Sequence, residues 1–457
     1  MKKQKKIYRG AAAFLIAIGC IYVYHTFHVP MQYLKTFKQA FETEMHPEFL
    51  DARTVWVEQQ DKVHQGYLLV KPYSDINADK VSAYLFDQTG EIVHEWQVIS
   101  KDIVRDEDLE DYFSTTGIKS NQFLLHIVDA HVLQDGDMIL NFLKIYENTI
   151  GMYPFSYLVR IDKDSNVKWA RHGEGSFHHE FEINKAGQVI AIESTLEKDF
   201  PLINYQDFSN IRYIDAVIHV IDPDTGDTLE SFSVTEAFLK SGHTPYLSLA
   251  AHGEDDVIKT TGLIFLDPYH ANDVVYIEQN VANAVPFLEK GDILVSLKHL
   301  DLVAAVRPSE NAVIWARRGP WHGQHYLEID DKGILTLVDN IGYRVFTKHK
   351  DNMLDRQYRL RILEYNILND TSKTIFRHEN PVHFPSPSRS SYARLDNGHL
   401  LITFTDQGRV IQVDENNGLV WEFRATKDRM KQYNYLHRKS RLLTRYYPAD
   451  TLRVEDW

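Results

Sequence analysis

The most regular pattern in the chain is a short run of alternating apolar and polar residues that turns at a glycine and runs back. It recurs five times after residue 66, with turns such as Asp-x-x-Gly and Asn-Gly. The copies are HVLQDGDMIL (131–140), FEINKAGQVIAI (181–192), FLEKGDILVSL (287–297), LEIDDKGILTL (327–337) and ARLDNGHLLITF (393–404). Turns of this kind between alternating apolar residues predict β-hairpins.

A second hairpin pattern alternates with the first and ends on an aromatic residue. Its copies are YLFDQTGEIVHEW (84–96), VRIDKDSNVKW (159–169), HVIDPDTGDTLESF (219–232), VRPSENAVIW (306–315) and VIQVDENNGLVW (410–421), with a weaker copy at 362–376. Two hairpins make four strands, and repeated four-stranded sheets are typical of propeller blades. Five units are complete, and the strands at 66–70 and 81–97 supply most of another. We therefore predict an all-β, six-bladed β-propeller, although the spacing also allows five or seven blades.

The alternating hairpin repeats are interrupted between Val234 and Asp267. We expect a long insertion here, with one short helix at Thr235–Lys240. Long loops on a rigid repeat scaffold often carry function, so the end of this insertion is a place to look for a site.

The N-terminus carries a different pattern. Basic residues between positions 2 and 9 precede an apolar run of 20 residues from Gly10 to Val29. Such a run just spans a hydrocarbon core of about 30 Å, and the basic residues keep its N-terminal side in the cytoplasm. We therefore predict an uncleaved transmembrane anchor. The alternative is lipoprotein-type processing at Cys20, which the apolar residues after it disfavour. An amphipathic helix at Tyr33–His46 would follow as a stalk.

Composition narrows the range of functions. The chain has 457 residues, of which 50 are basic and 64 acidic, for a net charge of −14. A chain this acidic is a poor nucleic-acid binder, so we expect no nucleic-acid partner. The single cysteine excludes an internal disulfide and any multi-cysteine metal site. Neither a phosphate-binding glycine loop nor a G-x-S-x-G nucleophile motif occurs, and we predict no cofactor.

Two histidines occupy the same place in the repeat. His179 and His325 each begin the pattern H-x-x-E-I-[ND]-x-x-G, which ends at Gly187 and Gly333. Equivalent positions in a propeller lie on a ring around one axis, so we expect these imidazoles to converge at the channel. His178 precedes His179, and in a strand the two would point to opposite faces. The repeat register favours His179 for the channel.

Further candidates lie at the end of the insertion and after the next hairpin. His270 is part of the segment DPYHAN (267–272), and Lys298 and His299 follow the segment Leu-Val-Ser-Leu, which ends the next hairpin. Imidazoles act as nucleophile, acid or base near neutral pH, and a lysine holds negative charge. The group therefore suits an anionic, oxygen-rich substrate.

Two other interpretations apply to the same histidines. Repeats also preserve packing positions, so the shared register alone is compatible with a structural role. Alternatively, three histidines with Glu180 could hold zinc with one open position. Because no helical H-E-x-x-H is present and the ligands would come from separate blades, we predict no metal.

Seven segments occur in an order and at spacings that match one known family. They are GYLLV…YLFDQTGEIVHEW (66–96), HHE (178–180), DPYHAN (267–272), SLKH (296–299), GQH (323–325), VDN (338–340) and LDNGHLLITFTDQGRVIQV (395–413). With them, residues 66–450 resemble the bacterial arylsulfotransferase family. The resemblance implies a six-bladed propeller that moves a sulfuryl group from an aryl sulfate to a phenolic acceptor. It also implies a sulfated histidine intermediate and no nucleotide sulfate donor.

The resemblance also implies roles for individual residues. His325 would be the nucleophile, while His270 and a histidine of the HHE segment would act as acid, base or oxyanion-stabilising groups. The predicted catalytic residues are His325, His270, His179 and Lys298. The predicted substrate contacts are His178, Asn272, His299 and Arg389. The family commonly has arginine where this chain has Lys298, which keeps the charge but not the planar fork of donors.

These considerations predict three segments. Residues 1–30 form a basic tip and membrane anchor, 31–65 a stalk, and 66–457 the propeller. Residues 30–65 are too few for the additional N-terminal β-domain that some family members use for dimerisation, so the oligomeric state stays open. We expect a single-pass protein of the bacterial inner membrane whose propeller faces the periplasm or the cell exterior.

The leading functional hypothesis is sulfuryl transfer between small aryl sulfates and phenols. One alternative is a non-catalytic envelope propeller that binds a glycan or a partner protein, because a fold does not determine a function. The other is a metal-dependent hydrolase or lyase.

Overall fold

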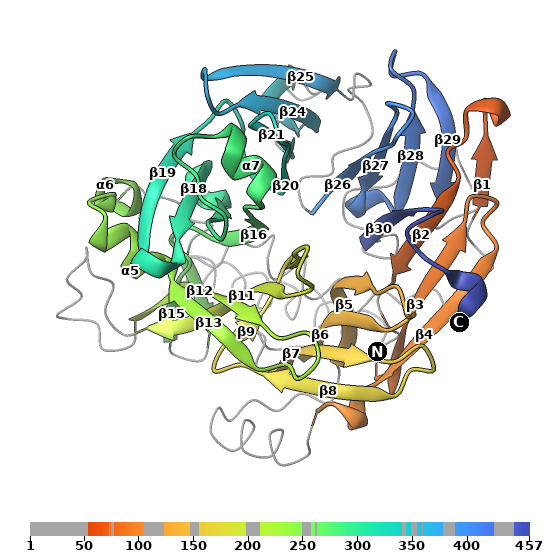
Figure 1. The fold of residues 1–457 in the computed structure, drawn as a ribbon, viewed down its shortest axis with the longest axis horizontal. Helices are drawn as coiled ribbons and strands as arrows, with labels where there is room; N and C mark the ends of the chain where they lie inside the picture. The colour runs from red at the N-terminus through yellow and green to blue at the C-terminus, as the bar shows by residue number, and fades with distance from the viewer. Residues whose placement is uncertain are drawn as a thin grey trace, which may run out of the picture.

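The computed structural model describes residues 54–72, 74, 77–104, 123–146, 155–197, 211–248, 257–260, 263–340, 344–348, 354–358, 360–377, 389–424 and 443–457. Within these ranges, six sheets of at least four strands each are arranged in a ring around one central axis (Figure 1). The predicted all-β, six-bladed propeller is therefore confirmed. Apolar side chains fill the space between neighbouring blades, as Leu69 and Trp96 of the first blade pack with Leu125 and Phe142 of the second.

Each blade runs antiparallel from an inner strand at the channel to an outer strand at the rim. The first three blades consist of β30 (Leu443–Pro448), β2 (Gly66–Lys71), β3 (Lys80–Asp87) and β4 (Ile92–Ile99); β5 (Phe123–Val132), β6 (Met138–Tyr146), β7 (Phe155–Ile161) and β8 (Val167–His172); and β10 (Glu182–Ile183), β11 (Val189–Glu197), β12 (Ile211–Ile221) and β13 (Thr228–Ser233), with β9 (Ser176–Phe177) beside β11.

The other three blades follow the same order from the channel outward. They consist of β16 (Ala271–Tyr276), β17 (Ile293–Leu297), β18 (Leu302–Arg307) and β19 (Ala312–Arg318); β20 (Gln324–Ile329), β21 (Ile334–Asp339), β24 (Arg361–Asn366) and β25 (Thr371–Arg377); and β26 (Ser391–Arg394), β27 (Leu400–Phe404), β28 (Arg409–Val413), β29 (Leu419–Arg424) and β1 (Thr54–Val57). A separate hairpin, β22 (Arg344–Lys348) and β23 (Leu354–Tyr358), lies between β21 and β24 in the sequence.

Segments from both ends of the chain close the ring. Strand β30 pairs along the whole of β2 and becomes the inner strand of the first blade. Strand β1 pairs with β29 and becomes the outermost strand of the sixth blade. The propeller thus takes in residues that the sequence analysis assigned to the stalk at 31–65. These residues belong to the propeller because Val55 packs its apolar side chain against the core between the sixth and first blades.

Four of the five glycine-turn hairpins form as predicted, with Gly187 and Gly333 in the left-handed region at φ +85° and +74°. The hairpin predicted at 287–297 is wrong. Only Ile293–Leu297 forms a strand, and its partner β16 lies before the helix α7 (Gln279–Ala284). Ile277 N–H donates to the Asp292 carbonyl over 2.8 Å. This bond brings the end of β16 next to the start of β17, and helix α7 lies in the connection between the two strands.

The aromatic residue that ends the second hairpin pattern ties one blade to the next. The indole N–H of Trp96 donates to the carbonyl of Gly136 over 3.0 Å, and that of Trp169 donates to Pro223 over 2.9 Å. Trp421 of the sixth blade makes the same kind of bond to Gln88 of the first, over 2.8 Å. The repeated aromatic position therefore satisfies a buried donor while it fixes the blades to each other.

Carboxyl groups fix the blades to each other at the channel. Each accepts a hydrogen bond from the next blade. The bonds run from Phe181 N to Asp129, from Tyr276 N to Glu182, from Leu327 N to Asp273, and from the Tyr392 hydroxyl to Glu328. The inner strands are thereby held at fixed positions around the axis, and the residues at their ends are held with them.

The predicted insertion after the third blade contains the expected helix, α5 (Val234–Lys240). Ser233 caps it, since its hydroxyl accepts a hydrogen bond from Glu236 N over 3.0 Å. The helix α6 (Thr244–Ser248) and two strands follow. The strands β14 (Val257–Thr260) and β15 (Leu263–Leu266) extend the third sheet, because β15 runs parallel to β12.

No helix among the described residues is long and apolar enough to cross a membrane. The predicted anchor at 1–30 and the helix predicted at Tyr33–His46 lie outside the described residues.

Candidate active site

The candidate residues come from the same end of successive inner strands. His179 lies shortly before β10, His270 directly before β16 and Arg389 shortly before β26, while His325 is the second residue of β20. His179, His270 and Arg389 have φ of +60°, +47° and +54°, and Tyr326, next to His325, has φ of +54°. Left-handed backbone is unfavourable for residues other than glycine, and such residues tend to gather at functional sites.

Three of the predicted imidazoles meet at this end of the channel. The Nε2 atoms of His179 and His270 are 2.9 Å apart, which is hydrogen-bonding distance. The ring centroids of His179 and His325 are 6.0 Å apart. Residues that are widely separated in the sequence therefore lie in one cluster, as the repeat register indicated.

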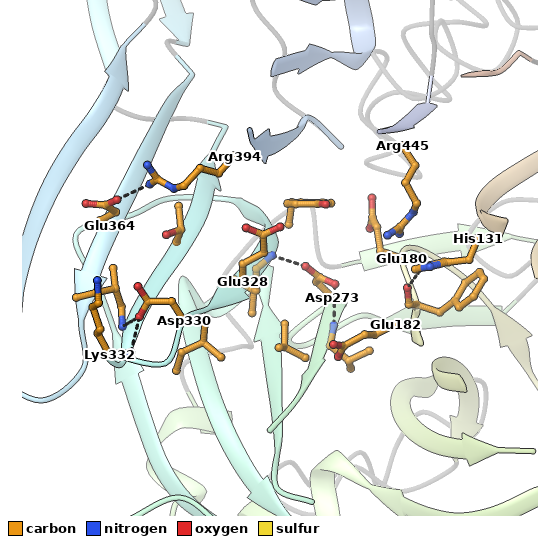
Figure 2. A pocket seen from close by; sticks show the side chains of 18 residues that line it. His131, Glu180, Glu182, Asp273, Glu328, Asp330, Lys332, Glu364, Arg394 and Arg445 are labelled. Carbon is orange, nitrogen blue, oxygen red and sulfur yellow. Dashed lines mark hydrogen bonds and ion pairs between the residues drawn. The ribbon is translucent and has the colours of Figure 1, made fainter. Parts of the chain in front are cut away.

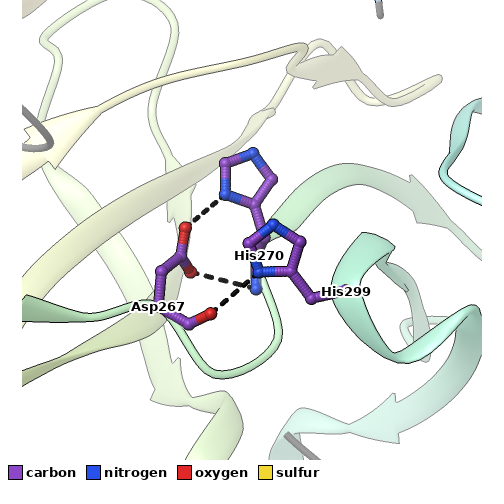
Figure 3. Close-up of side chains that lie close together, drawn as sticks. All are labelled: Asp267, His270 and His299. Atoms are coloured by element: carbon purple, nitrogen blue, oxygen red, sulfur yellow. Dashed lines mark hydrogen bonds and ion pairs between the residues drawn. The ribbon is translucent and has the colours of Figure 1, made fainter. Parts of the chain in front are cut away.

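His270 and His299 are oriented by the same residue, Asp267 (Figure 3). The Asp267 carboxylate accepts from Nδ1 of His270 and also from its backbone N–H. The Asp267 carbonyl lies 2.8 Å from Nδ1 of His299, and the two rings stack with centroids 4.7 Å apart. With Nδ1 of His270 acting as donor, its Nε2 is left as an acceptor that faces His179.

The orientation of His325 also follows from its neighbours. Its Nδ1 lies 2.7 Å from Oδ1 of Asn340 and 3.1 Å from the carbonyl oxygen of Gly323. A backbone carbonyl only accepts, so Nδ1 carries the hydrogen and Nε2 carries the lone pair. His325 thus has the tautomer required of a nucleophile at Nε2.

His178 does not point away from the site. Its Nε2 lies 2.5 Å from the Ser194 hydroxyl, and its ring centroid is 4.9 Å from that of His179 and 6.2 Å from that of His270. The expectation that only one of the two adjacent histidines faces the channel is wrong. It assumed a regular strand, whereas β10 begins only at Glu182 and His179 is left-handed.

Two cations lie beside the imidazoles. Lys298 begins a single 3-10 turn (Lys298–Leu300), and its backbone N–H donates to the His270 carbonyl over 3.1 Å. Its charge helps to lower the pKa values of His270 and His325. The charge of Arg389 does the same for His178 and His179. Nη1 of Arg389 is buried without a hydrogen-bond partner among the described residues, which suits a guanidinium meant for an anion.

All four central imidazoles are neutral at neutral pH. Burial lowers the pKa of His178 to about 3 and that of His270 to about 4, and it holds those of His179 and His325 well below the usual value. Burial alone would raise the pKa of Asp267, but its contacts with His270 keep it below its usual range. The site therefore combines neutral imidazoles with one carboxylate and fixed cations.

The remaining predicted contact, Asn272, has a different place. Its side chain is fully buried, and Nδ2 donates to the carbonyl of Gln324 over 2.7 Å. This bond ties the fourth blade to the strand that carries His325. Sequence reasoning missed the orienting roles of Asp267, Ser194 and Asn340. The segments DPYHAN and VDN contain the first and the last of these residues.

A metal remains chemically compatible with one part of the site. Asp267, His270 and His299 each offer a ligand atom, and these atoms lie within 4.8 Å of one another. The zinc hypothesis named Glu180, which is not part of this group. Both Nδ1 atoms already bond to Asp267, so the arrangement serves to orient the rings.

A family model described as arylsulfotransferase (ASST) matches residues 129–426. The chain belongs to the arylsulfotransferase family. The matched range holds every candidate residue named above, from His178 to Arg389. No curated protein matches the sequence.

Several solved structures are also similar to this arylsulfotransferase family member. A protein of unknown function from Bacteroides caccae is 12% identical, with 79% of this chain and 93% of that chain covered and a TM-score of 0.42. An inactive variant of virginiamycin B lyase from Staphylococcus aureus with quinupristin is 8% identical, with 80% and 87% covered and a TM-score of 0.36. These scores are too low to support a conclusion about the reaction.

Proposed function

We propose that this chain transfers a sulfuryl group from an aryl sulfate to a phenolic acceptor, with His325 carrying the group in between. The observation that carries the proposal is the fixed tautomer of His325 inside a cluster of neutral histidines and cations. Family membership supports the same reaction class. The neutral imidazole supplies a lone pair for sulfur, and the cations suit the sulfate oxygens.

The chemistry divides into two steps. In the first, Nε2 of His325 attacks sulfur, the bond from sulfur to the aryl oxygen breaks, and the leaving phenol takes a proton from the neighbouring histidines. In the second, the acceptor phenol attacks the sulfated histidine and returns a proton. Lys298 and Arg389 hold the sulfuryl oxygens in both steps, a contribution of about 3 kcal/mol each in comparable oxyanion sites. Arg389 provides the planar fork that Lys298 lacks.

The proposal is tested by changing His325→Ala. We expect turnover of p-nitrophenyl sulfate with a phenol acceptor to disappear, because no other group supplies the attacking nitrogen. Intact-mass measurement of the wild-type chain after incubation with the aryl sulfate should show a gain equal to SO3, and the variant should show none. His172→Ala, an exposed residue of the outer strand β8, is the matched control and should behave as wild type.

Other outcomes would contradict the proposal. Wild-type turnover in the His325→Ala variant would exclude this residue as nucleophile. A wild-type chain that gains no mass and releases no phenol would favour the non-catalytic binding propeller. Stoichiometric metal in the purified protein, bound through Asp267, His270 and His299, would favour a metal-dependent hydrolase or lyase.

The proposed place of action is the outer side of the bacterial inner membrane. This proposal rests on the charge and apolar pattern of residues 1–30, which lie outside the described residues. Fractionation of cells that produce the full chain should recover it with the membranes, and recovery in the soluble fraction would contradict the proposed anchor.

A further inference from the structure

The channel holds a second polar feature beside the histidines, a cavity of about 710 Å³ lined by several carboxyl groups (Figure 2). Glu182, Asp273 and Glu328 line it, and each accepts one of the inter-blade hydrogen bonds described above. Glu180 also lines it but does not take part in these bonds. Its Oε2 is buried and has no hydrogen-bond partner among the described residues. Among the described residues, Oε2 of Glu180 therefore does not bond one blade to another as the other carboxyl groups do.

Glu180 faces the Nδ1 side of the His179 ring. Its Oε2 lies 3.7 Å from Nδ1 of His179, and that nitrogen is likewise buried without a hydrogen-bond partner in the described part of the chain. On its other side, His179 must donate from Nε2, because Nε2 of His270 is an acceptor. Nδ1 of His179 therefore carries a lone pair. An ionised carboxylate would repel this lone pair, whereas a protonated carboxyl can donate to it after a small rotation.

The surroundings of Glu180 also favour the protonated form. Burial raises its pKa to about 7, and the neighbouring charge of Asp129 adds to this effect. The charged groups around it are Asp129 from β5, Lys71 from β2, Arg445 from β30 and Arg389 before β26; Asp273 from β16 also lies close, and burial raises its pKa well above the usual value. Lys71 and Arg445 both bond to Asp129, over 2.8 and 2.9 Å, so that carboxylate offsets their charge.

We infer that Glu180 stores the proton that the two steps of the proposed reaction exchange, and that it acts through His179. Glu180 does not touch the reacting atoms, so it is a positioning residue. The inference rests on the proposed function. It follows from a continuous line of contacts, in which the carboxyl faces Nδ1 of His179 and Nε2 of His179 bonds to His270.

The proton that Glu180 gives up in the first step returns to it in the second. As the bond from His325 to sulfur forms and the aryl oxygen leaves, that oxygen takes the proton from Nε2 of His179. The Glu180 proton moves to Nδ1, so the phenol leaves neutral and Glu180 becomes a carboxylate. In the second step the acceptor hydroxyl gives its proton to Nε2 of His179 and the bond from nitrogen to sulfur breaks. The Nδ1 proton then returns to Glu180.

The test compares Glu180→Gln with Glu182→Gln in single-turnover experiments on each step. The first step needs a protonated Glu180, so its wild-type rate should fall as pH rises through about 7. The second step needs the carboxylate, so its rate should rise with pH. In Glu180→Gln both rates should drop roughly 100-fold and lose this pH dependence, since the amide cannot exchange a proton.

Glu182→Gln is the matched control. Burial also raises the pKa of Glu182 to about 7, but its carboxyl bonds to Tyr276 N instead of facing a histidine. Its pH profiles should match wild type, and Glu180→Asp should recover part of the rate. A wild-type pH profile in Glu180→Gln would overturn the inference. So would an equal loss in both glutamine variants, which would mean that the effect belongs to the cavity as a whole.

A spectroscopic readout separates this inference from the proposed function. Infrared difference spectra of substrate-free Glu182→Gln protein, which lacks the other carboxyl of similar pKa, should contain a protonated-carboxyl band that titrates near neutral pH and is lost when Glu180→Gln is added. If wild type forms sulfated His325 but the band is unchanged in the variant, the inference alone fails. If wild type forms no sulfated His325, the proposed function fails and the inference fails with it.

Discussion

Three of the four imidazoles at the centre of the site have an orienting group on the Nδ1 side. For His325 this group is Asn340, for His270 it is Asp267, and for His179 it is Glu180 at longer range. Because the protein is rich in histidines, the residue type alone does not distinguish a histidine of the site from the others. A partner that determines which ring nitrogen carries the proton gives each ring a distinct chemical role.

At this scale we predict that Asn340→Ala lowers kcat roughly 100-fold, because the His325 ring loses its main anchor and keeps only the bond to Gly323. KM for the aryl sulfate should change little, since the proposed mechanism assigns Asn340 to the His325 ring and not to the substrate. Steady-state kinetics with p-nitrophenyl sulfate checks both values. Asn369→Ala, in an exposed turn, is the control, and an unchanged kcat in Asn340→Ala would contradict the assigned role.

At the scale of elements, the inner strands position the side chains of the site. They range from two residues in β10 to ten in β5, and side chains from neighbouring blades hold them in addition to the pairing within their own sheets. The bond from Leu327 N to Asp273 is the nearest example, because it lies two residues from His325 and beside the irregular pairing at Tyr326. A change in one blade is therefore expected to move a catalytic group in the next.

We predict that Asp273→Ala destabilises the protein by about 1–3 kcal/mol, because the buried amide of Leu327 loses its acceptor. Urea unfolding measures this change, and activity should fall as well because β20 is no longer held in place. Asp273→Asn retains an oxygen acceptor and should recover most of the stability. Equal losses in both variants would show that the negative charge, and not the hydrogen bond, is what matters.

At the scale of the whole molecule, strands β30 and β1 contribute unequally to closing the ring of blades. Strand β30 completes the first blade at the channel, and the residues that follow it bury Leu452 against the core. Strand β1 adds a fifth strand to a blade that already has four. The C-terminal closure should thus contribute far more to the stability of the ring.

We predict that removal of residues 443–457 prevents formation of a stable propeller, whereas removal of residues 1–57 leaves one that still unfolds cooperatively. Thermal melting followed by circular dichroism, together with size-exclusion chromatography, measures both. A cooperative, monodisperse protein lacking 443–457 would contradict the assigned importance of β30.

The sequence predicts those features that depend on neighbours along the chain. Glycine turns and alternation are local, so most hairpins and the number of blades could be predicted, and the repeat register related His179 to His325. The strand β30 carries no repeat pattern, and the partner of Ile293–Leu297 lies beyond a helix. The direction of His178 depends on one backbone angle. The roles of Asn340 and Glu180 depend on distances that only the assembled blades create.

The pairing of β30 with β2 also bears on how the protein is made. Residues 66–71 are translated well before residues 443–448, so the edge of β2 stays open until β30 has been made. A copy that stalls or is clipped before Leu443 carries an unpaired strand edge, the feature by which proteins aggregate. Unfinished copies are in this way chemically distinct from finished ones, and a protease or chaperone that recognises open strands can remove them selectively.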